Sequence, residues 1–167
     1  LVSNGERADF VESGDAILVL DKTSFYAESG GQVGDTGVIT IGDSTFEVSN
    51  TTKDADGVVL HHGTLTEGDA INVGDKAIAS IDATRRQAIM RNHTAAHLLQ
   101  AALRKVLGDH VEQAGSYVDV ERFRFDFSHF EAMTTEQIAE VEQKVNDAIL
   151  SAMDITVSEL PIEEAKK

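Results

Sequence analysis

The sequence predicts an α+β protein, in which a small β-barrel precedes a long helix packed on an antiparallel sheet. Two observations support this prediction. Between residues 16 and 82, short apolar runs alternate with glycine and aspartate, as in a series of strands joined by turns. Near residue 84, the apolar spacing lengthens from two residues to about 3.6, the period of a helix. We therefore expect a barrel domain at residues 1–83 and a second domain at residues 84–167.

Several segments of the first part have the length and composition of strands. Glycine and aspartate lie between them at positions 42–43, 54–57 and 74–75, where they favour turns. Strands at this spacing, with no helical period between them, predict a small closed or nearly closed barrel. The expected strands are residues 16–20, 37–41, 45–48, 57–60 and 76–81.

Composition restricts the class of protein. A hydrophobic content of 41% over 167 residues is typical of a globular chain. No apolar run approaches the roughly 18 residues of a membrane span, so we expect no membrane partner. The absence of cysteine is typical of a cytoplasmic protein and leaves no thiolate ligand for a metal. Because the chain begins with Leu1 and stops just after the helix start expected at Pro161, we expect a piece truncated at its C-terminus.

The formal net charge of -15 argues against a protein that coats nucleic acid, because phosphate binding draws mainly on lysine and arginine. A local basic cluster nevertheless lies on or beside the expected helix. It could receive a phosphate-bearing partner, or its side chains could simply be solvated. The cluster comprises Arg85, Arg86, Arg91, Arg104 and Lys105.

A glycine-rich segment at residues 24–37 is too polar for a buried strand. Its glycines permit positive φ angles and close backbone approach, which predicts a shaped loop. Gly30-Gly31-Gln32 matches the catalytic tripeptide of peptide-release factors, but the neighbouring Glu28 and Asp35 are unlike a basic, RNA-facing loop. We therefore favour a structural turn over a catalytic one.

The segment Arg91-Asn-His-Thr-Ala-Ala-His97 carries the candidate site. Residues four apart on a helix lie about one turn from each other, so His93 and His97 can face one metal ion or substrate. The apolar residues of the helix fall on the opposite side. The two histidines are therefore expected to be exposed and available to a ligand.

Two histidines supply only half of a zinc site, which takes three or four protein ligands. His110 and His129 could contribute, and further ligands could come from beyond Lys167 or from a partner. Thr94 stands where zinc proteases of the His-Glu-x-x-His type place their glutamate base, so protease chemistry is not expected. A helix with two exposed histidines and no ligand remains the alternative.

A second pair, His61-His62, ends an expected strand. Adjacent residues of a strand point to opposite faces, so the two rings cannot share one ion. We expect one at the surface and one inside, with no metal role.

The C-terminal half contains a strand and a second helix. Phe123, Phe125 and Phe127 alternate with charged residues, which predicts a half-buried strand whose phenylalanines belong to the core. Thr134 and Gln137 form a possible capping box for a helix that reaches about residue 153. Residues 155–157 are a possible further strand.

Four motifs, taken in order, resemble the alanyl-tRNA synthetase family, and together they span most of the chain. The resemblance implies a translation-factor-like β-barrel leading into an editing-type domain, which free-standing alanyl-tRNA editing proteins also contain. The motifs are FYAESGGQVGDTG at residues 25–37, RNHTAAHLL at 91–99, QAGS at 113–116 and RFDFSH at 124–129.

The resemblance also assigns roles to residues. His93 and His97 match the first two ligands of the editing zinc ion (Zn2+). Gln113 falls where the family places a residue near the mischarged amino acid, and Thr94 is a further candidate beside the substrate. The family's remaining zinc ligands belong to a later Cys-x-x-x-His motif. The zinc site of this piece is therefore expected to be incomplete and the isolated piece to have little or no editing activity.

The function implied by the resemblance is hydrolysis of mischarged Ser-tRNA-Ala and Gly-tRNA-Ala. The partner is the acceptor end of tRNA-Ala with its serine or glycine ester. The parent synthetase would charge tRNA-Ala with alanine, using ATP and Mg2+ at a core outside this piece. Two alternatives remain open: a free-standing editing protein, and a non-catalytic module that binds RNA or protein.

Overall fold

The computed structural model describes residues 1–3, 6–154, 156 and 158–165. It confirms the α+β class, with antiparallel sheets and helices in one chain. The chain divides into two compact units. Unit 1 comprises Leu1–His97 and Glu112–Ser128, and unit 2 comprises Leu98–Val111 and His129–Lys167. The expected domain boundary after residue 83 stays a prediction, because a group of packed residues need not coincide with an inherited domain.

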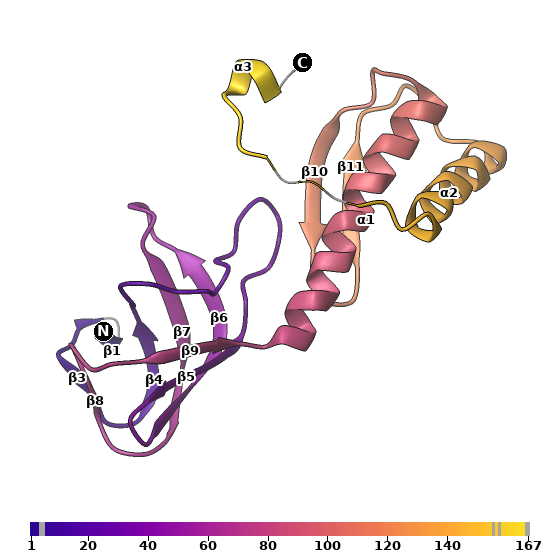
Figure 1. Ribbon diagram of the computed structural model, residues 1–167. Helices are drawn as coiled ribbons and strands as arrows, with labels where there is room; N and C mark the ends of the chain where they lie inside the picture. The colour runs from indigo at the N-terminus through magenta and orange to yellow at the C-terminus, as the bar shows by residue number, and fades with distance from the viewer. Residues whose placement is uncertain (4–5, 155, 157, 166–167) are drawn as a thin grey trace. The chain divides into compact units, whose positions relative to one another are not determined.

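The main sheet of unit 1 has the strand order β2-β1-β4-β7-β6-β5-β9, and every neighbouring pair is antiparallel (Figure 1). A separate pair, β3 and β8, packs on the same core. The strands are β1 Val2–Ser3, β2 Glu6–Arg7, β3 Phe10–Val11, β4 Gly14–Leu18, β5 Gly37–Ile41, β6 Ser44–Lys53, β7 Val59–Glu67, β8 Ile71–Asn72 and β9 Ile78–Ile81.

The sheet does not close into a full barrel within the described residues. Its edge strands are β2 and β9, and no pairing joins them there. Both edges are short, with two residues in β2 and four in β9, so neither offers a long row of free backbone groups. The predicted closed or nearly closed barrel is therefore not observed among the described strands. The strands instead form an open antiparallel sheet that packs around one hydrophobic core.

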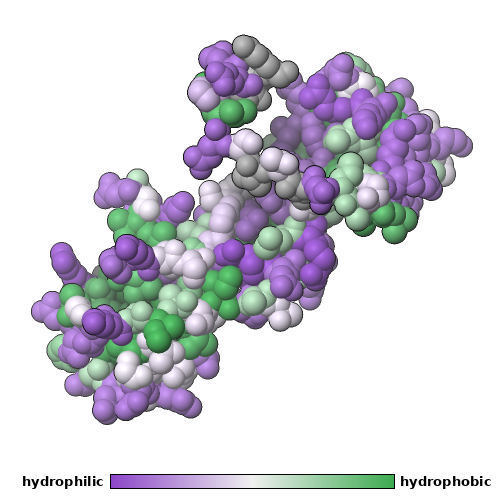
Figure 2. Space-filling model, viewed as in Figure 1, coloured by the Kyte–Doolittle hydropathy of each residue, from purple (hydrophilic) through white to green (hydrophobic). Residues whose placement is uncertain are grey.

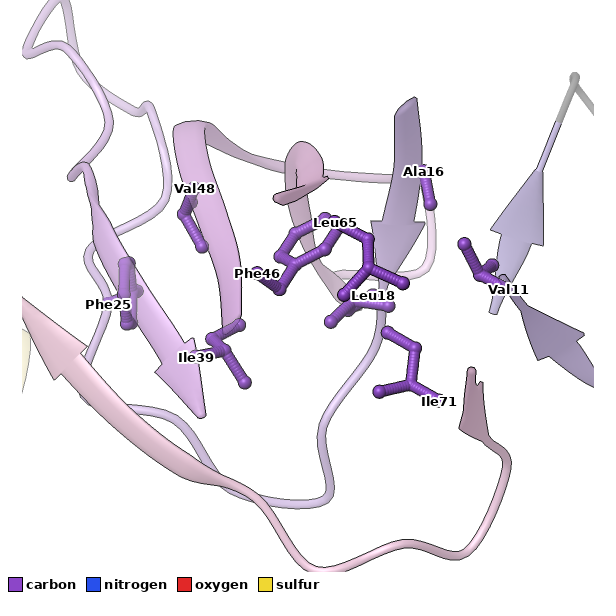
Figure 3. Packing of buried hydrophobic residues seen from close by; sticks show 9 residues of the cluster. All are labelled: Val11, Ala16, Leu18, Phe25, Ile39, Phe46, Val48, Leu65 and Ile71. Carbon is purple, nitrogen blue, oxygen red and sulfur yellow. The ribbon is translucent and has the colours of Figure 1, made fainter. Parts of the chain in front are cut away.

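Nine buried side chains form the hydrophobic core of the sheet. Phe46, Leu65 and Leu18 point toward one another between the strands (Figure 3). Strand β6 alternates between buried and exposed positions from Ser44 to Val48, which places its apolar residues on the core side. The remaining core members are Val11, Ala16, Phe25, Ile39, Val48 and Ile71.

Strands β6 and β7 extend beyond their expected ends. After Val48, strand β6 continues through Ser, Asn and Thr residues as far as Lys53, with a register shift between Val48 and Asn50. Polar side chains of this stretch form hydrogen bonds with neighbours. The Thr51 hydroxyl, fully buried, donates to the backbone oxygen of Asp35 at 2.9 Å. A prediction from the apolar pattern alone therefore places the end of β6 too early in the sequence.

The long helix α1, Ala83–Leu107, begins where the sequence predicts. Asp82 caps it, because its Oδ1 accepts a hydrogen bond from the backbone N–H of Arg85 at 2.9 Å. Gly108 follows the last turn with φ 117°, a conformation that favours glycine. After α1 the hairpin of unit 1 is formed by β10, Gln113–Val118, and β11, Phe123–Phe127.

Unit 2 contains helix α2, Thr135–Leu150, and the short helix α3, Ile162–Ala165. The capping box predicted from Thr134 and Gln137 is present, with both reciprocal hydrogen bonds formed. The helix ends three residues before the expected residue 153. Residues 155 and 157 of the possible strand lie outside the described residues.

The apolar side chains of α2 are only partly buried. Val141 is buried, whereas Ile138 and Ile149 are 53% and 52% exposed. Hydrophilic residues predominate over the surface that α2 forms at the right of Figure 2. The described helices also include none that is long and apolar enough to cross a membrane.

Candidate functional site

His93 and His97 lie together on an exposed face of α1. Their ring centroids are 4.8 Å apart and the ring planes are inclined by 76°. Both side chains are exposed, while Ile89 and Ala96 of the same helix are buried. The predicted placement of both rings on the polar side of the helix is therefore confirmed.

The electrostatic setting favours the neutral form of His93. Partial burial lowers the pKa of its imidazole, and the positive charge of a protonated His97 lowers that pKa further. A neutral imidazole has a free nitrogen lone pair, which is the form that binds a metal ion. The neutral ring of His93 can therefore supply a nitrogen ligand.

The described residues do not complete a metal site. No group of three or more His, Cys, Asp or Glu side chains among them could hold an ion. His110 and His129, the other candidate ligands, instead contact each other in unit 2. The Nε2 of His110 lies 2.9 Å from the Nδ1 of His129, and the rings are stacked with centroids 5.1 Å apart. The described residues thus provide two candidate zinc ligands, His93 and His97, of the three or four that a zinc site takes.

Gln113 and Thr94 are both exposed. Gln113 is the first residue of β10, pairs with Phe127 and precedes a register shift in the hairpin. Thr94 follows His93 on α1. In the part of the chain that the structure describes, no hydrogen bond joins Gln113 to either histidine of α1. The two residues are accessible, and their proximity to a bound substrate stays a prediction.

One side chain of α1 anchors the helix to the hairpin end. Asn92 Nδ2 donates a hydrogen bond of 2.8 Å to the backbone oxygen of Asp119, the residue directly after β10. Asp119 also caps the hairpin turn, since its Oδ1 accepts from the backbone N–H groups of Glu121 and Arg122. These hydrogen bonds lower the pKa of the Asp119 carboxyl. Sequence reasoning missed this contact, although Asn92 lies within the histidine motif.

The phenylalanines of β11 are half-buried, as expected of residues that alternate with charge. Phe125 and Phe127 stack with ring centroids 6.4 Å apart. The prediction of a half-buried strand is therefore confirmed, but none of the three phenylalanines is among the buried core residues.

The Gly30-Gly31-Gln32 segment forms a tight turn. The backbone N–H of Ser29 donates to the oxygen of Gln32 at 3.2 Å, and the N–H of Gln32 donates to the oxygen of Ser29 at 3.0 Å. Gly30 and Gly31 have φ angles of 60° and 81°, which favour glycine. The predicted structural turn is therefore confirmed.

Two arginines of the expected phosphate cluster are occupied within the protein. Arg86 forms an ion pair with the buried carboxylate of Asp35, and Arg85 Nη1 donates to the backbone oxygen of Gly34 at 2.8 Å. The interpretation of these two as a free basic site is thus corrected. Each had a polar partner in the glycine-rich loop that local sequence could not identify.

The rings of His61 and His62 lie on opposite faces of their strand, as predicted. His61 is fully buried, and its Nδ1 lies 2.9 Å from the backbone oxygen of Leu18. His62 is half-buried, with its Nε2 2.7 Å from the Thr52 hydroxyl. The two rings face different partners on opposite sides of β7, as the geometry of a strand requires.

Three relatives of this chain are alanine–tRNA ligases. Residues 1–85 match the family described as tRNA synthetases class II (A). The chain is 48% identical over 168 residues to an alanine–tRNA ligase of Acetivibrio thermocellus, covering 100% of this chain and 19% of that protein. It is 49% identical over 168 residues to the alanine–tRNA ligase of Bordetella pertussis, with the same coverage of both chains.

A third relative is the alanine–tRNA ligase of Pseudoalteromonas translucida, 48% identical over 165 residues and 98% of this chain. In all three the chain spans 19% of the length of the relative. The similarity covers the strands of the main sheet, helix α1 and the β10–β11 hairpin alike, since it runs over essentially the whole chain. This chain therefore belongs to the class II (A) tRNA synthetases, in the alanyl-tRNA synthetase family.

Proposed function

We propose that this chain forms part of the editing region of a cytoplasmic alanine–tRNA ligase. In this proposal the parent charges tRNA-Ala with alanine, using ATP and Mg2+. The editing region hydrolyses the ester that joins serine or glycine to the same tRNA. In this proposal the open antiparallel sheet of unit 1 corresponds to a translation-factor-like barrel that does not close, and α1 with the β10–β11 hairpin begins an editing-type domain.

The need for such a reaction follows from the limits of binding selectivity. A pocket shaped for alanine cannot strongly exclude the smaller glycine. One added hydroxyl in an apolar pocket gives only about a hundredfold discrimination against serine. A second site that hydrolyses the wrong ester corrects the errors that binding alone leaves.

The observation that supports this proposal is the exposed pair of imidazoles on α1. His93 and His97 would hold a zinc ion from one side, with rings 4.8 Å apart and with His93 favoured in its neutral form. The remaining ligands would come from outside the described residues. When bound, zinc supplies a Lewis acid that polarises the ester carbonyl or lowers the pKa of a water molecule.

Gln113 and Thr94 would act on the substrate side of this site. The Gln113 amide can both donate and accept, so it can pair with the hydroxyl of a seryl ester. Thr94 presents a hydroxyl beside the first histidine, where it can orient the ester or a water molecule. Both side chains are exposed and so are free to meet a tRNA end.

The test uses the full-length protein that contains this chain. His93→Ala, His97→Ala and the double variant are compared with His62→Ala, a histidine of the sheet that lies outside the proposed site. Bound zinc is counted by mass spectrometry, and hydrolysis of Ser-tRNA-Ala is followed under single-turnover conditions. We expect the helix variants to lose zinc and at least about a hundredfold in hydrolysis, because direct ligands matter more than their supporting residues.

The rate of alanine charging serves as the internal control. We expect the variants to leave it unchanged, because His93 and His97 lie outside residues 1–85, the segment that matches the synthetase family model. Equal hydrolysis by the parent, the helix variants and His62→Ala would refute the zinc assignment.

A further inference from the structure

The glycine-rich loop, residues 24–37, contacts the two elements that carry the proposed editing residues. Its base contacts the first turn of α1, the helix with His93 and His97. Its tip contacts the end of β10, the strand that begins at Gln113. These contacts lie within unit 1.

The tip of the loop pairs with β10 through its backbone. The N–H of Val118 donates to the oxygen of Gly31 at 2.8 Å, and the N–H of Val33 donates to the oxygen of Val118 at 3.1 Å. Gln32 and Val118 thereby form a parallel bridge, so the tip extends the hairpin by a short third segment. Val118 is buried, which protects these hydrogen bonds from water.

Only glycine fits at position 31. A Cβ added there would overlap the backbone oxygen of Ser116 in β10, which has no side-chain freedom with which to move away. The neighbouring Gly30 has a similar positive φ, but a Cβ added to it would have no atom within 4 Å. Both glycines therefore have a positive φ, but only Gly31 packs directly against β10.

The base of the loop is fixed to α1 by charge and by hydrogen bonds. Asp35 is 2% exposed and receives the guanidinium of Arg86 and the backbone N–H of Tyr26. Arg85 donates to the oxygen of Gly34, the residue before Asp35. The loop therefore has little freedom at either end.

We propose that this loop sets the position of β10 relative to α1, and that Gly31 and Arg85 are positioning residues of the editing reaction. The inference rests on the proposed function, because it concerns the alignment of Gln113 with the histidine pair. A shift of β10 displaces Gln113 and weakens its recognition of the seryl hydroxyl. Hydrolysis of glycyl esters, which have no hydroxyl to recognise, is affected less.

The test compares Gly31→Ala with Gly30→Ala in the full-length protein. For each, kcat/KM is measured with Ser-tRNA-Ala and with Gly-tRNA-Ala, and the ratio of the two gives the preference for serine. We expect Gly31→Ala to reduce this ratio about fivefold or more, the value of one hydrogen bond, toward that of Gln113→Ala. Gly30→Ala should keep the ratio within about twofold, since it carries the same backbone strain without the overlap.

Zinc content and hydrogen exchange separate positioning from loss of structure. Gly31→Ala should retain its zinc and should exchange the Val118 amide proton faster than Gly30→Ala does. General unfolding would lower kcat/KM for both substrates by the same factor, and the preference for serine would stay unchanged.

The outcomes distinguish this inference from the proposed function. If Gln113→Ala and His93→Ala leave hydrolysis of both esters unchanged, the proposed function is wrong. If those variants act as expected but Gly31→Ala has the ratio of Gly30→Ala, the positioning role is overturned.

If Gly31→Ala does not fold, Arg85→Met decides the question at the other end of the loop. Arg85 is half-buried and makes one hydrogen bond to Gly34, so its loss is compatible with folding. A lower serine preference in Arg85→Met supports the inference, and an unchanged preference overturns it.

Discussion

Arg86 and Asp35, 51 positions apart in the sequence, form a bidentate ion pair that joins the first turn of α1 to the glycine-rich loop. Arg86 Nε lies 2.9 Å from Oδ1 and 3.1 Å from Oδ2 of Asp35, and Nη2 also donates to Oδ2. The side chain of Asp35 is 3% exposed and that of Arg86 is 25% exposed. The hydrogen bond to Asp35 raises the pKa of Arg86, which keeps the guanidinium charged.

The first prediction concerns the stability that this pair provides. Arg86→Met leaves the buried carboxylate of Asp35 without its cation. Breaking a buried pair typically costs about 3–5 kcal/mol, and we expect about 2–3 kcal/mol here because Arg86 is partly solvated. The measurement is urea unfolding of the chain, followed by circular dichroism.

The control is Arg104→Met, which breaks the exposed pair between Arg104 and Asp109 at 3.4 Å. Its effect on the free energy of unfolding should be below about 1 kcal/mol. If both variants are destabilised by the same small amount, Arg86 does not anchor the loop.

The elements with a strong local pattern were predictable from the sequence. Strand β5 occupies the expected residues 37–41, and α1 begins and ends where its caps indicate. The two-residue strands β1, β2, β3 and β8 were missed, because two residues carry no alternation. The structure reveals them only through their pairing, of β1 with β2 and β4 and of β3 with β8, which an apolar pattern does not contain.

In the candidate site, too, features set by a local pattern were predictable and contacts with distant residues were not. The shared face of His93 and His97 follows from the helical period alone. The partners of Arg85 and Arg86 could not be predicted, because the sequence does not show which distant carbonyl or carboxylate an arginine will meet. The close contact of Gly31 with β10 could not be predicted either. Its partner Ser116 is 85 positions away, and a positive φ alone is enough to explain a glycine at position 31.

The second prediction concerns pH and His61. Burial lowers the pKa of this ring below its ordinary 6.5, an effect that the hydrogen bond to Leu18 opposes and that His62 reinforces. The backbone oxygen of Leu18 can only accept, so Nδ1 carries the proton and Nε2 accepts from the Thr23 hydroxyl at 2.8 Å. The folded protein therefore favours the neutral ring.

The sign of the effect follows from proton binding in the two states. Near pH 6.5 the unfolded chain binds a proton at His61 and the folded chain does not, so protonation favours unfolding. The contribution is complete above pH 6.5 and is lost as the pH falls toward the lower folded pKa. One such group changes the free energy of unfolding by at most about 1.4 kcal/mol per pH unit.

The measurement is urea unfolding between pH 5 and 7.5 of the parent, His61→Gln and Thr23→Val. The destabilisation caused by His61→Gln should shrink as the pH falls, because the parent loses stability that the variant never had. Thr23→Val keeps the ring but removes the hydrogen bond that Nε2 accepts, so it should keep a pH dependence of the same sign as the parent's. A constant difference between the parent and His61→Gln at every pH would contradict the prediction.

The third prediction separates the hydroxyl of Thr94 from its place on the helix. Thr94→Val keeps the shape of the side chain and nearly the same helix propensity while removing the hydroxyl. Thr94→Ser keeps the hydroxyl and removes the methyl group. Because Thr94 is exposed, both changes should alter the free energy of unfolding by less than about 0.5 kcal/mol.

If Thr94 orients the ester or a water molecule, Thr94→Val should lower the single-turnover rate of Ser-tRNA-Ala hydrolysis about tenfold. That is the loss expected for a hydrogen bond that acts on a charged group. Thr94→Ser should remain within about threefold of the parent, and both variants should bind as much zinc as the parent does. Equal rates for Thr94→Val and Thr94→Ser would remove Thr94 from the site. The assignment of His93 and His97 would be untouched by that result, since it depends on zinc content and not on this hydroxyl.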